Sequence, residues 1–418
     1  MASAKMAKKK TSKKAADAKK IRICYVNPTL LIKRPVSEIS SKIKSKGVNG
    51  KHVDTTVIYP KKLFRKSDKS LHHSKLLEHS NVINYSTLNL PLKSEQPIPV
   101  TFAYSYYAFT IFKNNDIVHM WVPYYITNLK FIFIKKLFFP KKKLILTMDT
   151  VPGYSFSMGK PLDKIFKIYN KLFGWIIYKT PDVVTLYGKS LVPFAIKAGI
   201  PKSKIQVIST GISQKDVNDE IRKKTRKELC KELNIPENST IVVFAGLMVP
   251  RKGVEKIIEM AKILKKENIY FIMCGDGPNK DLYIQKAAEL GLLGKMSFLG
   301  WRKDMDKMYK GSDLLVLPAE GEGLPGVVME AMSYGLPCVA SDIPCIPDLI
   351  EDGKSGYLCN KDRPAEFAKR IKELSKKKDL RHKMGHNSIS KMKSFDWDVI
   401  ISKYQKLYSE LLEDNLRK

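Results

Sequence analysis

Short apolar segments alternate with longer amphipathic segments along most of this 418-residue chain, and this alternation restricts the possible folds more than any other feature. Segments such as IRICYV (21–26) and TIVVFA (240–245) are continuously apolar, as strands buried on both faces of a sheet are. Segments such as LDKIFKIYNKLFGWIIYK (162–179) have apolar residues at helical spacing. Alternating strands and helices predict an α/β fold with doubly wound, mostly parallel sheets.

The alternation occurs in two blocks, which predict two Rossmann-like domains. We expect a disordered, basic tail over residues 1–20, an N-terminal domain over 21–210 and a C-terminal domain over 211–395. The last amphipathic segment, 396–418, follows a loop, and we expect it to form a helix that crosses back to the first domain.

The net charge of +34 is concentrated in the first half of the chain. Residues 1–210 contain 38 Lys and Arg against 10 Asp and Glu, whereas residues 211–418 contain 37 against 31. Such asymmetry implies an acidic partner for the first domain, either a membrane surface or nucleic acid. No apolar run has the ~18 residues of a membrane span, and the N-terminus lacks a secretory signal, so a cytoplasmic protein is expected.

The cysteines and histidines are scattered and indicate no metal site. None of the six cysteines forms a CxxC pair, and the seven histidines show no metal-ligand spacing. We therefore expect reduced thiols, no disulfide framework, no bound metal and no cofactor.

Three stretches of the first half, 59–77, 128–144 and 163–179, combine cations with bulky apolar residues. The second contains six Phe or Ile and six Lys, a composition typical of segments that lie at a bilayer interface. We therefore hypothesise that the first domain docks on the inner membrane leaflet; a buried helix with a basic outer edge is the alternative. The lysines proposed to contribute to docking are Lys135, Lys136, Lys141, Lys142 and Lys143.

Two loops of the second block carry polar groups at the ends of expected strands, where ligands of open parallel sheets bind. In LMVPRKG, Arg251 and Lys252 precede a helix that begins near Gly253, so they are candidates for binding phosphate; a solvated basic loop is the alternative. The sequence CGDGP (274–278) indicates a tight turn that a ligand can approach closely. It is not a GxGxxG motif and does not predict a dinucleotide site.

The third loop, within AEGEGLPGVVMEAMSYG (319–335), carries two glutamates in otherwise small or apolar surroundings. We expect Pro325 at the first helical position and Gly335 at the helix end, with Glu322 in the loop and Glu330 on the second turn. Because carboxylates accept hydrogen bonds from hydroxyl pairs, these two glutamates are candidates for holding the diols of a nucleotide-sugar. A capping loop with an incidental surface glutamate is the alternative.

EGLPGVVMEAMSYGLPCVAS (322–341) resembles the Glu-x7-Glu signature of glycosyltransferase family 4. The resemblance extends over nearly all of 235–418, with further motifs in family order: VVFAGLMVPRKGVEKIIE, CGDGP, SFLGWR, GSDLLVLPAEGEGLP, DGKSGYL and FDWDVIISKYQKLYSELL. The first half matches more loosely, through IRICYVNP, DIVHMW and KKLILTMD. The resemblance implies a GT-B fold, with two Rossmann-like domains whose parallel sheets face a central cleft and a C-terminal helix returning to the N-terminal domain. It also implies a retaining, metal-independent enzyme that uses a nucleotide-sugar, with UDP or GDP as the expected nucleotide.

The family resemblance also implies roles for individual residues. Lys252 would neutralise the donor diphosphate, assisted by Arg251; Glu322 would hold hydroxyls of the transferred sugar, and Glu330 the ribose. The backbone near 298–300 would receive the base. The remaining donor-binding residues implied are Gly246, Gly323, Leu324 and Pro325.

The chain departs from the family pattern at three places. Leu247 stands where the family usually has arginine, and NPTLLIKRPVSE (27–38) lacks the usual glycine pair, so Lys33 or Arg34 is expected to substitute. Asp149 stands near the usual position of a histidine, where it would receive the acceptor proton, hold a hydroxyl or simply end a strand. His119 is expected to be a hydrogen-bonded residue at a strand end.

The sequence does not identify the acceptor molecule. We hypothesise a lipid-linked glycan or a glycolipid, with a small molecule or polysaccharide as the alternative. A basic nucleic-acid-binding protein is a further class, but no recognition helix, RRM signature or zinc finger is present, and the glutamates would repel phosphates. A nicotinamide enzyme is disfavoured because no GxGxxG follows the first strand.

Overall fold

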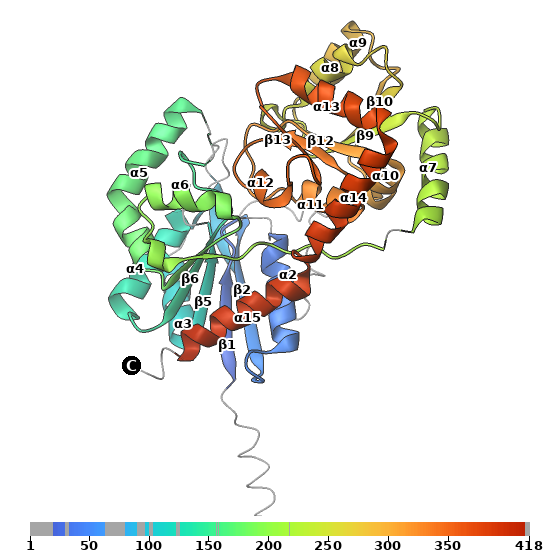
Figure 1. Ribbon diagram of the computed structural model, residues 1–418. Helices are drawn as coiled ribbons and strands as arrows, with labels where there is room; N and C mark the ends of the chain where they lie inside the picture. Colours follow the sequence, from blue (N-terminus) through green and yellow to red (C-terminus); the bar gives the residue numbers. More distant parts are fainter. Residues whose placement is uncertain are drawn as a thin grey trace, which may run out of the picture.

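The computed structural model describes residues 20–29, 33–62, 80–89, 97–99, 103–122, 126–155, 157, 159–216 and 218–413. All but one residue of the expected basic tail, and most of the basic stretch 59–77, lie outside these ranges. The chain forms two α/β units, each with helices packed around a parallel sheet (Figure 1).

The first unit is built on a sheet whose described strands follow the order β4-β3-β2-β1-β5-β6-β7-β8. Neighbouring strands are parallel except for β3 and β4, which are antiparallel. The strands are β1 (Ile21–Val26), β2 (Val53–Lys62), β3 (Asn81–Asn89), β4 (Pro97–Pro99), β5 (Ile117–Trp121), β6 (Lys143–Met148), β7 (Val183–Leu186) and β8 (Ile205–Val207). The helices are α2 (Arg34–Lys46), α3 (Ala103–Asn114), α4 (Ile126–Phe138), α5 (Lys160–Lys179) and α6 (Val192–Lys197).

The second unit contains a parallel sheet in the order β11-β10-β9-β12-β13-β14. Its strands are β9 (Thr240–Ala245), β10 (Ile269–Cys274), β11 (Met296–Gly300), β12 (Leu314–Leu317), β13 (Cys338–Ser341) and β14 (Gly356–Cys359). Its helices are α7 (Asp219–Leu233), α8 (Val254–Ile263), α9 (Lys280–Glu289), α10 (Met305–Gly311), α11 (Gly326–Ser333), α12 (Ile346–Leu349), α13 (Pro364–Lys376) and α14 (Lys378–Lys393).

The central strands are buried throughout because helices cover both faces of each sheet. Every residue of β5, β6, β7, β9 and β12 is buried, which explains their continuous apolar sequences. The two-domain, doubly wound prediction is therefore confirmed.

The last helix, α15 (Trp397–Glu413), leaves the second unit and lies along the first, beside α2 (Figure 1). At the start of α15, the Trp397 ring packs against Gly211, where a Cβ would lie only 2.5 Å from the ring. The two segments that cross between the units, near Gly211 and near Trp397, therefore pack against each other. Farther along, the Tyr408 hydroxyl lies 2.7 Å from Nδ1 of His119 in β5. The predicted return of the C-terminal helix is confirmed, and its buried face becomes part of the first unit's core.

Two of the lysines expected to contribute to membrane docking are buried instead. Lys135 is 5% exposed; its Nζ lies 3.4 Å from a carboxylate oxygen of Asp182 and donates to the Pro140 and Thr180 carbonyls. Lys143 is 7% exposed at the start of β6. That part of the docking prediction is wrong, because these lysines are used within the fold. Among the helices that the structure describes, none is both long and apolar enough to cross a membrane.

Candidate functional site

The loop after β9 and the loop after β12 lie side by side because their strands are neighbours in the sheet. Lys252 ends a short 3-10 turn, Pro250–Lys252, and Gly253 follows with φ of 72°. A Cβ at Gly253 would overlap the carbonyl oxygen of Pro318, the residue directly after β12. Only glycine fits both the left-handed backbone and this close approach, so the two loops are locked together.

Lys252 and Glu322 form a largely buried ion pair at this junction. Lys252 Nζ lies 2.5 Å from Oε1 of Glu322, and the two side chains are 12% and 8% exposed. Arg251 Nη1 lies 3.4 Å from the other carboxylate oxygen and donates to the Gly321 carbonyl at 2.6 Å. Two cations therefore converge on one carboxylate, with the backbone loop held by the same arginine.

Glu330 lies on the second turn of α11 and is held from two sides. The hydroxyl of buried Tyr309, on α10, donates to its Oε2 at 3.0 Å. Burial, followed by the nearby Glu330 charge, raises the pKa of Tyr309, so the phenol remains a donor. On the other side, Nη1 of Arg34 lies 3.5 Å from Oε1 of Glu330. Arg34 comes from the first unit, so this contact spans the two domains.

Lys33, the N-cap residue of α2, and Asp149, directly after β6, form the facing side of the site. Lys33 Nζ donates to Oδ2 of Asp149 at 2.6 Å, and both side chains are about three-quarters buried. Burial alone would raise the pKa of Asp149, but the Lys33 ammonium and its hydrogen bond outweigh burial and lower it overall. Asp149 also lies against the Glu322 loop, since a Cβ on Gly323 would lie 3.2 Å from the Asp149 Cβ.

The structure thus brings most of the predicted site residues to one junction between the domains. Both cations expected to replace the glycine pair, Lys33 and Arg34, reach it, at the first turn of α2. Lys33 is the N-cap residue of α2 and Arg34 is its first residue, and the start of a helix favours anions. The predicted site residues Lys252 and Glu322 are in direct contact, whereas Glu330 contacts Arg34 of the facing domain.

Other predicted positions differ in detail. Pro325 precedes α11 rather than occupying its first position, so that placement was wrong by one residue. Leu247 is exposed, and Leu324 is buried under the loop. Gly246 has φ of 153°, and a Cβ on Gly275 would overlap its carbonyl, so the β9 and β10 loops meet backbone to backbone.

His119 is a structural residue, as expected. It is buried between the Tyr408 hydroxyl and Thr147, and burial lowers its pKa well below the ordinary value, so it is neutral. It lies in the middle of β5 rather than at a strand end, so the placement was wrong while the hydrogen-bonded environment was right.

A second contact between the domains was not foreseen from the sequence. Asp348, on α12, accepts from the backbone N–H of Lys189 at 2.7 Å and of Ser190 at 3.1 Å. Ser190 Oγ donates to the same carboxylate at 2.5 Å and accepts from Cys345 N at 2.7 Å. We call these four residues the Asp348 clasp. Because its partners are more than 150 residues apart, sequence spacing gives no signal for it.

Comparison with known proteins finds similar sequences and similar structures. Residues 225–391 match the family model "Glycosyl transferases group 1". N-acetyl-alpha-D-glucosaminyl L-malate synthase of Bacillus anthracis is 28% identical over 236 residues, which are 56% of this chain and 61% of that protein. UDP-Gal:alpha-D-GlcNAc-diphosphoundecaprenol alpha-1,3-galactosyltransferase of Escherichia coli is 29% identical over 216 residues, 50% of this chain and 55% of that protein.

Among solved structures, the Anabaena protein Alr3699/HepE, crystallised with UDP and glucose, superposes with a TM-score of 0.72. The match covers 93% of this chain and 100% of that one at 17% identity. The fold is therefore that of the GT-B glycosyltransferase structures, and most of the second unit matches the family model of group 1 glycosyl transferases. The chain spans little more than half of the length of the two curated relatives described above.

Proposed function

We propose that the chain is a retaining glycosyltransferase of family 4 that transfers a sugar from a nucleotide-sugar to a lipid-linked acceptor at the inner face of a membrane. The observation that carries the donor half of this proposal is the contact of Lys252 with Glu322, with Glu330 and Arg34 beside it. These residues supply fixed cations for a diphosphate and fixed carboxylates for two sets of hydroxyls.

In this proposal, Lys252 and Arg251 neutralise the charge that develops on the leaving diphosphate. Fixed cations in a site that excludes water are worth several kcal/mol to such a transition state, because they need no reorganisation. Lys33, Arg34 and the start of α2 add positive potential from the facing domain. Glu322 holds hydroxyls of the transferred sugar, and Glu330, oriented by Tyr309, holds the ribose.

The reaction breaks the bond between the anomeric carbon and the diphosphate oxygen and forms a bond to the acceptor oxygen on the same face. The acceptor proton then passes to the departing diphosphate. Asp149 is a weak base in this arrangement because its pKa is lowered by Lys33. We therefore assign Asp149 the role of holding Lys33 and an acceptor hydroxyl, rather than receiving the proton.

UDP is the nucleotide we favour. The Escherichia coli relative is named for UDP-Gal, and the Anabaena structure contains UDP. The test is a thermal-shift screen of UDP-, GDP- and ADP-sugars on the wild type and on Glu330→Ala. A UDP-sugar should raise the melting temperature of the wild type, because a ligand stabilises by mass action, and the variant should lose that shift. An equal shift in both proteins would contradict the proposed site.

The lipid-linked acceptor is proposed from one face of the N-terminal domain, formed by α5 and α4. Along α5, apolar side chains are exposed at helical spacing; among them, Ile165 and Leu172 are 58% exposed and Trp175 is 54% exposed. Lysines flank this stripe on the same helix. We call the exposed side chains Leu162, Ile165, Ile168, Leu172, Trp175, Leu137 and Phe138 the apolar face.

The apolar face is continuous between the two helices. Nζ of Lys136, on α4, lies 4.1 Å from the centre of the Trp175 ring, so the exposed end of α4 adjoins α5. Exposed aromatics bordered by lysines match the chemistry of an anionic bilayer surface, with apolar groups entering the interface and cations meeting headgroups. The start of α5 follows the loop that leaves Asp149, so a lipid-linked acceptor bound there would be close to the site.

Cosedimentation with vesicles of anionic phospholipid tests this surface. A first variant, with Ile165, Leu172 and Trp175 replaced by serine, should lose most vesicle binding. In a second variant, with Lys164, Lys167 and Lys171 replaced by glutamine, the vesicle binding that remains should be insensitive to salt. Ile263→Ser with Leu282→Ser removes exposed apolar groups from the C-terminal domain and should leave binding unchanged. If all three variants bind vesicles equally, the acceptor is better explained as a soluble molecule.

A further inference from the structure

A cavity of about 790 Å³ lies on the C-terminal domain, at the opposite end of its sheet from Lys252 and Glu322. Thr240, the first residue of β9, and Asp313, just before β12, both line it, whereas the donor loops follow the other ends of these strands. Helices α7 and α14 supply the walls. The cavity is therefore separate from the site described above.

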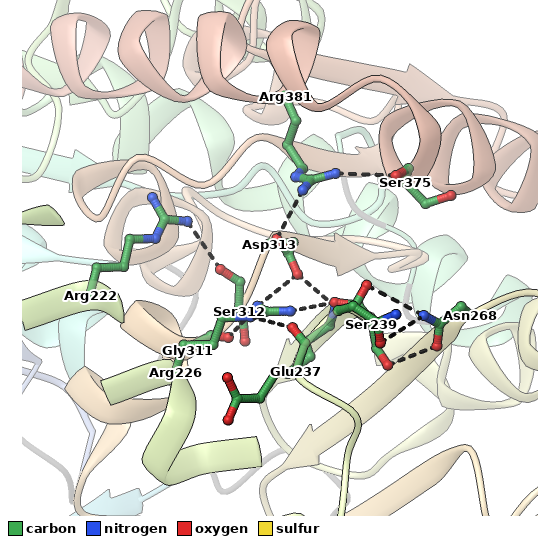
Figure 2. Close-up of polar contacts among 12 residues, drawn as sticks. Arg222, Arg226, Glu237, Ser239, Asn268, Gly311, Ser312, Asp313, Ser375 and Arg381 are labelled. Carbon is green, nitrogen blue, oxygen red and sulfur yellow. Dashed lines mark hydrogen bonds and ion pairs between the residues drawn. The ribbon is translucent and has the colours of Figure 1, made fainter. Parts of the chain in front are cut away.

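An ion network forms the floor of this cavity (Figure 2). Arg226 Nη1 lies 2.9 Å from Oδ2 of Asp313, and Arg381 Nη2 lies 3.2 Å from Oδ1. Oδ2 also accepts from the backbone N–H of Ile241 at 2.8 Å. The same arginines also donate to carbonyls: Arg226 Nη1 to that of Gly311 and Arg381 Nη1 to that of Leu374. The network therefore connects α7 and α14 to the starts of β9 and β12.

Cations remain in the cavity after Asp313 has been paired. Arg222 donates to the Ser312 carbonyl at 3.1 Å, as Figure 2 shows, but among the described residues no carboxylate lies within ion-pair distance of it. The same holds for Lys223 and Lys378, which also line the cavity. Besides Asp313, the acidic residues of the lining are Asp219 and Glu237, so the lining carries more positive than negative charges. Two histidines, His382 and His386, also line the cavity.

His382 lies among the same cations of the cavity lining. Burial, followed by the charges of Arg222, Arg381 and Lys378, lowers its pKa. The charge of Asp219 acts in the opposite direction, and an anion bound in the cavity would act in the same direction as Asp219.

We propose that this cavity binds a small phosphorylated molecule, held by Arg222, Lys223, Lys378 and His382. Guanidinium and ammonium groups are the side chains that recognise phosphate, and the cavity has the volume of ordinary small-ligand sites. The site is a second one, distinct from the proposed nucleotide-sugar site. Thr240 and Asp313, which line the cavity, lie at the starts of the two strands that lead to the loops of Lys252 and Glu322, so an occupant would contact the elements that position the donor loops.

Titration calorimetry with inorganic tripolyphosphate, in the presence of saturating UDP, tests the proposal. The double variant Lys223→Glu/Lys378→Glu should lower tripolyphosphate affinity at least about tenfold, since charged hydrogen bonds are lost and repulsion replaces them. The matched control is Lys224→Glu/Lys383→Glu, which makes the same charge change on the same helices outside the cavity lining. The control should change the affinity less than about twofold.

Equal loss in both double variants would mean that tripolyphosphate responds only to net charge, and this would overturn the proposal. So would unchanged affinity in the cavity variant, or binding of a single-stranded oligonucleotide that depends on Lys223 and Lys378 while tripolyphosphate does not bind. Failure of the glycosyltransferase assignment would appear differently, as absence of a UDP-sugar effect at Glu330, and would leave the tripolyphosphate result intact.

Discussion

Nζ of Lys252 lies 2.5 Å from Oε1 of Glu322, although the two residues are 70 positions apart in the chain. They meet because β9 and β12 are adjacent parallel strands and each residue belongs to the loop that follows its strand. The pair is largely buried, so neither charge is free to move into solvent. Each group orients the other, so a donor bound at the proposed site would meet a cation and a carboxylate already in place.

Lys252→Ala should lower kcat by about 100- to 1,000-fold, the usual loss when one group that stabilises a developing negative charge is removed. The measurement is steady-state sugar transfer, or donor hydrolysis, with the UDP-sugar found in the thermal-shift screen. The matched control is Lys256→Ala, one turn along α8, where the lysine pairs with Glu320 outside the site. Equal losses in the two variants would indicate a folding defect instead of a catalytic role.

Tyr309→Phe should raise KM for the donor at least about tenfold with little change in kcat, because the phenol positions Glu330 and does not touch the reacting atoms. The loss of one hydrogen bond to a carboxylate corresponds to about 1.5–3 kcal/mol. The control is Tyr334→Phe: its ring stacks on Tyr309 at 5.4 Å, but its hydroxyl binds Asp306. A fall in kcat at unchanged KM would contradict the positioning role.

Much of the fold follows from local sequence. Fully apolar segments such as TIVVFA become central strands because parallel sheets bury both faces, and LDKIFKIYNKLFGWIIYK forms most of α5 with its apolar stripe. The sequence also predicts that Lys252 and Glu322 lie at the same edge of the sheet, because each follows a parallel strand. These features depend on periodicity and on a general rule about parallel sheets.

Contacts between distant segments were not accessible in the same way. Lys135 has the sequence context of a surface cation, and only the position of Asp182 in the fold explains its burial. Tyr309 gives no signal because it lies on α10 and its partner lies beyond the next strand. The facing of Lys33 and Arg34 toward the C-terminal domain depends on how the two domains are placed, which no local pattern specifies.

Lys33→Gln should destabilise the protein at neutral pH by about 1–3 kcal/mol, because Asp149 would remain buried without its cation. The sign follows from the pKa. In the wild type the Asp149 pKa is lowered below its ordinary value of 3.8, so its stabilising contribution is present above that value and is lost as the pH falls below it toward the folded pKa. In the variant the effect of Lys33 is absent and burial is the largest influence left, so the pKa of Asp149 should rise. The variant should then lose stability as the pH rises from the ordinary value toward that raised pKa.

Denaturant unfolding of both proteins from pH 7 down to about pH 4 measures this effect, and the free-energy difference should shrink as Asp149 becomes protonated in the variant. Lys46→Gln is the control, since Lys46 pairs with exposed Asp398 on the protein surface. A difference between wild type and Lys33→Gln that is independent of pH would show that Asp149 does not depend on Lys33 for its charge.

Asp348→Ala should loosen the contact between the two domains, because one carboxylate accepts three hydrogen bonds from the facing domain. A weakening by about 1–3 kcal/mol would raise the population of an open form by about 5- to 150-fold. Small-angle scattering should show a larger radius of gyration, and donor turnover should fall with the closed population. The control is Asp342→Ala, which removes an exposed carboxylate from the same domain and should change neither the radius of gyration nor the donor turnover.

Gly188→Ala tests the same clasp from the other domain. A Cβ at Gly188 would overlap Oδ2 of Asp348, so the carboxylate must swing away from the backbone N–H groups that it accepts from. The single variants should therefore open the domains in the same direction. The double variant Gly188→Ala/Asp348→Ala should be no more open than Asp348→Ala alone, because both changes remove the same interaction. Additive opening would mean that Gly188 and Asp348 act on separate contacts, and the clasp would then not hold the domains together.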